Sequence, residues 1–197
     1  MNEVSKRIDQ VVKEGLSKVM KENGFKKSGR TFLKELDDGW HIVNIQASSG
    51  NLGKDGKFAV NLGVINNAIS EKSGLKIPSK PKEYDSTVRE RLGILVHGED
   101  YWWEISDQTD ISDLANEISE AMSSHGFPWL QKYSNLADIS DKLKQQPSLQ
   151  SIAAALLMGD ELEAKARYDQ ILLDRPAAKS RFKSWAKNLG LSWWQHL

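Results

Sequence analysis

The sequence predicts an α+β fold with an N-terminal helix, a mainly antiparallel five-stranded sheet and a helical C-terminal region. Apolar residues recur every three or four positions at the start of the chain, alternate with polar residues in the middle, and return to helical spacing after about residue 110. With 197 residues, 39% of them hydrophobic, the chain can bury a substantial core.

The first helix is predicted from an apolar stripe that ends before Asn23-Gly24. The stripe consists of Val4, Ile8, Val11, Val12, Leu16, Val19 and Met20. Asn and Gly tolerate the left-handed conformation that often ends a helix. Gly15 lies inside this helix, where glycine costs about 1 kcal/mol relative to alanine, so packing has to offset that cost.

A period of two predicts the five strands. The first three are separated by short turns, which favours antiparallel neighbours. A Pro- and Lys-rich stretch, Ser70 to Asp85, is interpreted as a surface loop. The five strands are expected at residues 25–36, 40–48, 57–65, 87–96 and 101–106.

The rest of the chain is predicted to be helical, at residues 110–124, 136–144, 148–158, 161–173 and 176–189. His125-Gly126 is expected to end the first of these helices. Trp185, Leu189 and Trp193 would dock the last helix. The chain is therefore divided into an α+β domain, residues 1–134, and a helical C-terminal extension packed on it, residues 135–197.

Charge and composition disfavour several classes of protein. The 27 basic residues balance the 27 acidic ones, so a global attraction to nucleic acid or to an anionic membrane is not expected. Cysteine is absent, which excludes disulfides and thiolate chemistry. The longest apolar run, Ile152 to Met158, is too short to span a membrane, and residues 1–15 do not resemble a signal peptide. A cytoplasmic location is expected.

No metal, cofactor or catalytic motif is predicted. The histidines, at positions 41, 97, 125 and 196, show no ligand spacing, and His97 to Asp100 is more simply a solvated turn. Gly50, Gly53 and Gly56 belong to a hairpin, because the lysine and serine or threonine of a phosphate loop do not follow them. A catalytic arrangement formed only by the fold would not be visible in the sequence.

Short motifs spread over residues 3 to 135 resemble a mostly bacterial family, the domain of unknown function 4304. They are Gly24-Phe25-Lys26-Lys27, Arg30-Thr31-Phe32, Trp40 with Val43 to Gln46, Phe58 to Val64, Arg91-Leu92-Gly93, Trp102-Trp103 and Pro128-Trp129-Leu130. The resemblance implies a shared α+β fold and supplies no activity. Separately, Gly159-Asp160, Ala164, Tyr168, Ile171 and Pro176 resemble half of one tetratricopeptide repeat, which is more simply a helical hairpin.

One face of the predicted sheet is unusually polar. Strand alternation places Val43 and Ile45 on the face opposite Asn44 and Gln46. Many antiparallel sheets have one solvated face. Asparagine is nevertheless disfavoured in strands, and arginine offers a planar fork of donors to a carboxylate, phosphate or peptide. The candidate binding residues are Asn44, Gln46, Asn61, Arg89, Arg91 and Trp103.

These residues favour a non-catalytic binding protein that recognises a protein or peptide through the polar face. The alternative is a hydrolase acting on a small phosphorylated or carboxylated substrate. Binding of single-stranded nucleic acid, with the sheet aromatics as stacking platforms, is a third hypothesis that the neutral charge disfavours. A deep pocket with perturbed carboxylates or His41 would favour the enzyme, and a shallow face would favour protein binding. The oligomeric state is not predicted.

Overall fold

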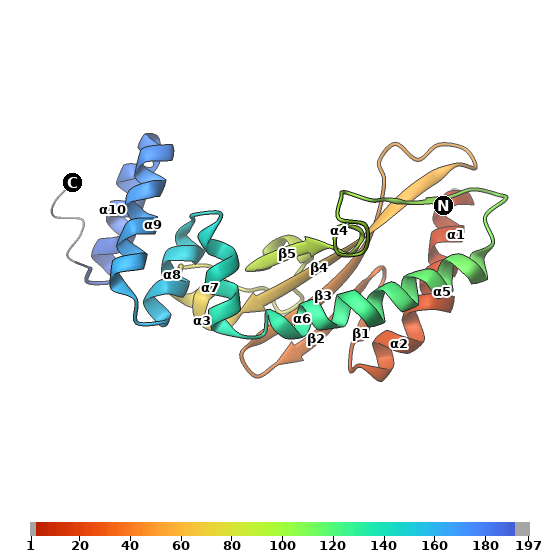
Figure 1. Ribbon diagram of the computed structural model, residues 1–197, viewed down its shortest axis with the longest axis horizontal. Helices are drawn as coiled ribbons and strands as arrows, with labels where there is room; N and C mark the ends of the chain where they lie inside the picture. Colours follow the sequence, from red (N-terminus) through yellow and green to blue (C-terminus); the bar gives the residue numbers. More distant parts are fainter. Residues whose placement is uncertain (1–2, 192–197) are drawn as a thin grey trace. The chain divides into compact units, whose positions relative to one another are not determined.

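The computed structural model describes residues 3–191 and groups the chain into two compact units (Figure 1). The first unit joins the residues up to 66 with residues 78–134, and the second joins residues 67–77 with those from 135 onward. The predicted α+β class is confirmed, because an N-terminal helix, an antiparallel sheet and C-terminal helices are all present. Trp193 and His196 lie outside the described residues.

The sheet of the first unit contains six antiparallel strands. They are β1 (Lys26–Ser28), β2 (Thr31–Leu36), β3 (Gly39–Ala47), β4 (Gly56–Asn66), β5 (Val88–Arg91) and β6 (Trp103–Ile105). Their order is β1-β2-β3-β4-β5, and β6 also pairs with β4. The single strand predicted over residues 25–36 is two strands, because Gly29 adopts a positive φ of 61° and turns the chain between them.

The strand predicted over residues 87–96 is wrong in its second half. β5 ends at Arg91, and helix α4 (Leu92–His97) follows at once. Leu92 is fully buried, and Gly93 packs so closely on Tyr101 that a Cβ would overlap the Tyr101 carbonyl oxygen. The apolar residues between Leu92 and His97 are too few to distinguish a strand from a short helix by their spacing, so tertiary packing decides that this segment is a helix.

The surface loop predicted for residues 70–85 is also only partly correct. Helix α3 (Asn67–Lys72) directly follows β4, and the 3-10 turn η2 (Glu83–Asp85) precedes β5. Ile69 and Ser70 are buried, and the Ser73 hydroxyl donates to the Ile69 carbonyl at 2.6 Å. The segment is rich in Pro and Lys, a composition typical of loops, so the short amphipathic helix at its start was not predicted.

Two long helices of the first unit each contain one wide π turn. The first consists of α1 (Glu3–Val11), the π turn η1 (Val12–Leu16) and α2 (Ser17–Glu22), and the second of α5 (Ile111–Ala121), the π turn η3 (Met122–Gly126) and α6 (Phe127–Lys132). The end predicted at His125-Gly126 is therefore wrong. Pro128 lacks the N–H that a regular helix would use, and the wide turn just before it accommodates the proline ring.

The core of the first unit lies between these helices and the apolar face of the sheet. That face contains Val43, Ile45, Phe58, Val60 and Leu62, all at most 3% exposed. Trp103 of β6 lies on the same face, where its indole Nε1 donates to the Glu117 carboxylate of α5 at 2.7 Å. The opposite face of the sheet carries the polar residues Asn44 and Asn61 together with the buried Ile42 and Ile65.

The second unit is helical. It contains α3, α7 (Leu136–Lys144), α8 (Leu149–Leu157), α9 (Glu161–Asp174), the 3-10 turn η4 (Pro176–Ala178) and α10 (Lys179–Asn188). Its buried cluster consists of Ile152, Ala155, Ala164, Tyr168, Ile171, Phe182 and Ala186. Trp185 packs against this cluster and donates to the Lys72 carbonyl at 3.1 Å, which ties α10 to α3.

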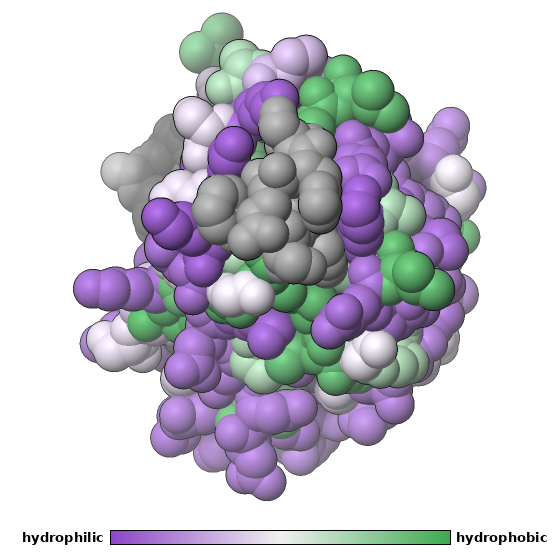
Figure 2. Space-filling model, turned by 90° about the vertical axis from the view of Figure 1, so that its left-hand side faces the viewer, coloured by the Kyte–Doolittle hydropathy of each residue, from purple (hydrophilic) through white to green (hydrophobic). Residues whose placement is uncertain are grey.

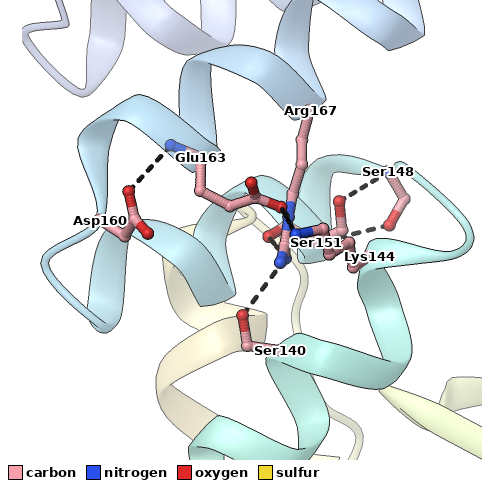
Figure 3. A network of polar contacts seen from close by, with 7 residues as sticks. All are labelled: Ser140, Lys144, Ser148, Ser151, Asp160, Glu163 and Arg167. Carbon is pink, nitrogen blue, oxygen red and sulfur yellow. Dashed lines mark hydrogen bonds and ion pairs between the residues drawn. The ribbon is translucent and has the colours of Figure 1, made fainter.

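A buried arginine connects α7, α8 and α9 (Figure 3). The guanidinium of Arg167, only 5% exposed, donates to the Ser151 carbonyl at 2.8 Å and to the Ser140 hydroxyl at 3.3 Å. Its Nε donates to the Glu163 carboxylate at 2.9 Å. The same carboxylate also forms an ion pair with Lys144. The hydrogen bond from Arg167 lowers the pKa of Glu163, so the pair stays ionised at neutral pH.

The surface viewed in Figure 2 is largely hydrophilic, with hydrophobic residues in separate groups. Leu162 and Leu173 of α9 are exposed by 86% and 75%. Isolated exposed leucines of this kind are common on proteins and do not by themselves define a site. No helix within residues 3–191 is long and apolar enough to cross a membrane.

Gly15→Ala is expected to destabilise the protein, although alanine is the better helix former. A Cβ at Gly15 would overlap the carbonyl oxygen of Ala115 in α5. Overpacking costs about 1–3 kcal/mol, which exceeds the gain of up to about 1 kcal/mol in helix propensity. Urea unfolding measures the change. Gly50→Ala, in an exposed turn with only an ordinary contact at 3.7 Å, is the matched control and should leave stability nearly unchanged. A stabilised Gly15→Ala would contradict this packing.

Candidate functional site: a polar groove on the sheet

The strand register places the predicted polar residues on one face of the sheet. Asn61 of β4 lies between Asn44 of β3 and Arg91 of β5, and Gly63 lies opposite Arg89. Gln46 lies opposite Ala59. Since side chains of paired residues project to the same side, five of the six predicted site residues share this face. We call it the polar face.

Amide side chains form hydrogen-bonded pairs on the polar face. Asn61, only 5% exposed, donates through Nδ2 to the Gln46 Oε1 at 2.9 Å. Asn44 donates in the same way to the Thr31 hydroxyl at 2.9 Å. These bonds compensate for burying amides in a strand, where asparagine is disfavoured.

Each arginine of the polar face is paired with a carboxylate. Arg91 donates through Nη1 to Asp100, and Arg89 contacts Glu83 at 3.5 Å. The Arg91 side chain is 30% exposed and its partner Asp100 is 56% exposed. Arg91 lowers the pKa of Asp100 through the hydrogen bond it donates. The Arg91–Asp100 pair is largely exposed and contributes little to stability, so Arg91 is available for another partner.

A groove of about 420 Å³ runs between the amides and the arginines. It is lined by Gln46, Asn61, Glu83, Arg89, Glu90, Arg91, Ile94 and Asp100. Asn61 is the polar-face residue of β4 that lines it. At one end, Ser86 packs on Gly63 so closely that a Cβ there would overlap the Ser86 hydroxyl. Volumes of this size suit a side chain or a small ligand.

Trp103 does not belong to the polar face. It pairs with Phe58 on the apolar face and is 1% exposed. Trp102 is the tryptophan at the groove, with its ring 4.8 Å from the Arg91 guanidinium carbon and 5.8 Å from the Lys57 ammonium. Adjacent strand residues point to opposite faces, so only the pairing of β6 with β4 decides which tryptophan is exposed. The sequence prediction therefore selected the wrong member of the pair.

Glu83 is a further groove residue that the sequence did not indicate. It lies in η2, which packs over β3 and β4, and its side chain is only 18% exposed. Burial raises the pKa of Glu83, and Arg89 and Arg91 offset part of that shift. No sequence pattern indicated Glu83, because it lies in the stretch that was interpreted as a surface loop.

His41 lies on the apolar face, away from the groove. It is 5% exposed, and its Nε2 lies 2.8 Å from the Ser134 hydroxyl. The pKa of His41 is lowered from 6.5 to about 4, because burial and, to a smaller extent, Lys34 outweigh the opposite effects of Asp38 and the Leu130 carbonyl. His41 is consequently a neutral core residue at pH 7, and it does not converge with the arginines.

A second hollow, of about 500 Å³, lies at the turn end of the β3–β4 hairpin, beside β6. The Asn51 side chain closes this hairpin through two hydrogen bonds to Lys57. Its Nδ2 donates to the Lys57 carbonyl, and its Oδ1 accepts from the Lys57 N–H. The glycines of this stretch thus serve a hairpin, as predicted. Among residues 3–191, no group of three His, Asp or Glu side chains is arranged to hold a metal ion.

The fold and the groove define an α+β protein with a polar, arginine-bearing sheet face. The family model for a domain of unknown function (DUF4304) matches residues 16–132, and the chain belongs to this family. The matched segment contains every strand and the whole groove. No curated protein and no solved structure matches the chain.

The two neighbouring tryptophans should respond very differently to substitution. Trp103→Ala removes a buried indole and should cost about 3–5 kcal/mol in the free energy of unfolding. Trp102→Ala removes only a partly exposed ring and its cation–π contacts, and should cost about 1 kcal/mol or less. Urea unfolding of both variants checks the assignment. Equal losses, or the reverse order, would show that the register of β6 is wrong.

Because the buried His41 is neutral, the protein should begin to lose stability at a pH above the range in which most carboxylates titrate. Its stabilising contribution is complete above about pH 6.5 and is lost as the pH falls towards 4, because the unfolded chain binds the proton first. The free energy of unfolding should therefore fall by about 2 kcal/mol between pH 7.5 and 5. In His41→Gln the pH dependence over this interval should largely disappear. An unchanged dependence would exclude His41 as its source.

Proposed function

We propose that the chain is a non-catalytic binding protein that recognises a protein or peptide through the groove on the polar face. The observation that carries the proposal is the stacking of Arg91 on Trp102 at the rim of the groove. Arginine, tryptophan and tyrosine are the residues that contribute most often to binding energy at protein interfaces.

The surroundings of the groove support the same function. Arg89 and Arg91 both line the groove. Tyr84, which follows Glu83 in η2, is 72% exposed. An exposed tyrosine combines apolar area with a polar tip and suits a peptide partner. A merely solvated sheet face needs neither stacked arginines nor exposed aromatic residues.

Glu83 favours the alternative, a hydrolase acting on a small phosphorylated or carboxylated substrate. A carboxyl group with a raised pKa beside arginines is suited to general acid or base catalysis. Turnover of p-nitrophenyl phosphate or of p-nitrophenyl esters that is abolished by Glu83→Gln would favour this enzyme. Absence of turnover by the wild-type protein across such substrates would count against it.

The cytoplasmic location, the bacterial origin and the tetratricopeptide-like character of the α8–α9 hairpin remain predictions. Fractionation of source cells and detection of the protein in the soluble fraction would test the location.

Affinity capture from a lysate of the source organism tests the binding proposal. The baits are the wild type, the groove variant Arg89→Gln/Arg91→Gln, and the control Arg175→Gln/Arg181→Gln, which removes the same charge from exposed residues of the second unit. A genuine partner should be retained by the wild type and the control and lost by the groove variant. The purified partner should then bind the groove variant more weakly by about 2 kcal/mol or more in calorimetry. Identical capture by all three baits would overturn the proposal.

A further inference from the structure

Arg91 is held as a pre-oriented fork of donors. Its guanidinium lies over the Trp102 ring, and Lys57 contacts the same ring from β4. The side chain is 30% exposed and lines the groove, so the Trp102 ring on one side and Asp100 on another restrict its position while part of it stays accessible. An arginine whose plane is already fixed loses less entropy when it binds a planar acceptor.

Only part of this fork is used within the protein. Nη1 donates to the Asp100 carboxylate, whereas Nε and Nη2 have no hydrogen-bond partner among residues 3–191. Across the groove, Gln46 accepts from Asn61 through Oε1, which leaves its Nε2 donors without a partner in the same part of the chain. The groove therefore presents unused donors from both of its sides.

Asp100 is weakly held in its position. It is 56% exposed and follows the turn formed by Gly98, whose φ is 77°. Its side-chain partners are Arg91 and Trp102, which are themselves in contact with each other. A carboxylate attached to an exposed turn can move away from Arg91 without disturbing the core.

We propose that Arg91 binds a carboxylate of the partner segment, an Asp or Glu side chain, and that Asp100 is the internal carboxylate this group displaces. This inference rests on the proposed function and adds the chemical class of the recognised group. Asp100 then sets the affinity of the groove, because each ligand carboxylate competes with it for the same guanidinium. The carboxylate already found on Arg91 shows that the geometry of the fork suits this acceptor.

The charges around the groove favour a carboxylate over a phosphate. Glu83 and Glu90 also line it, and both remain close to the bound group. Exchanging the Asp100 carboxylate for a partner carboxylate leaves the local charge unchanged, whereas a phosphate dianion adds a second negative charge beside these glutamates. A single-charge acceptor therefore fits the site better than a phosphorylated side chain.

Nuclear magnetic resonance titration with short capped peptides tests the proposal on the full-length chain. The probes are Ac-Gly-Glu-Gly-NH2, its neutral glutamine counterpart and its phosphoserine counterpart, observed through the Arg91 Nε–H and Trp102 Nε1–H signals. The glutamate peptide should shift both signals, and the glutamine peptide should shift neither. In Arg91→Gln, the shift at Trp102 should disappear.

Asp100→Asn provides the sharper measurement, since it frees Arg91 without changing the shape of the side chain. The glutamate peptide should bind this variant about threefold more tightly or better, because the internal competitor is lost. Glu104→Gln, which removes an equal charge from the neighbouring strand without contacting Arg91, should change affinity by less than about twofold.

Three results would overturn the inference: no shift at Arg91 with any variant, equal gains for Asp100→Asn and Glu104→Gln, or tighter binding of the phosphoserine peptide. If one of these occurs while the captured partner still depends on Arg89 and Arg91, the binding function stands and only the carboxylate assignment fails.

Discussion

The structure of the first unit depends on the two unlike faces of β4. One face carries Phe58, Val60, Leu62 and Val64, and it forms the sheet side of the core. The other face carries Ala59, Asn61 and Gly63, of which Asn61 lines the groove and Gly63 admits the close approach of Ser86. Because β4 pairs with β3, β5 and β6, it sets the register of all three. A shift of one residue would exchange the faces and bury the polar groups.

The groove follows directly from this arrangement. β5 and β6 pair with different stretches of β4, and Trp102 precedes β6 beside the Arg91 end of β5. The indole and the guanidinium are therefore in contact although ten residues separate them in the chain. Because Asp100 and Glu83 balance the two arginines locally, the groove contributes little to the net charge of the protein. Neutral overall composition consequently says nothing about the chemistry of the groove.

Regular alternation allowed much of this face to be predicted from the sequence. β3 and β4 pair over nine consecutive residues without a bulge, so the side assigned to Asn44, Gln46 and Asn61 is correct. Short elements were harder, because Leu92 to His97 alternates like a strand yet packs as a helix. The identity of the exposed tryptophan depends on pairing between distant strands, which no local pattern records. For Trp102 and Glu83, the deciding information is tertiary.

The π turns and the glycines show how packing overrides local preference. Gly15 lies in a π turn because α5 approaches it closely, and Pro128 lies in a helix because a π turn precedes it. Helix propensity alone disfavours both residues. Such positions are identified only when the neighbouring helix is known.

The placement of α3 has a consequence for how the chain acquires its structure during synthesis. α3 emerges between β4 and β5, yet Ile69 is fully buried and α3 packs in the unit formed with α8 and α10. A ribosome-bound chain that has completed the sheet still carries α3 without the helices that cover it. Cutting the chain after residue 134 would leave the same apolar surface exposed, so the two units are not independent modules that a protease or a gene fusion can separate cleanly.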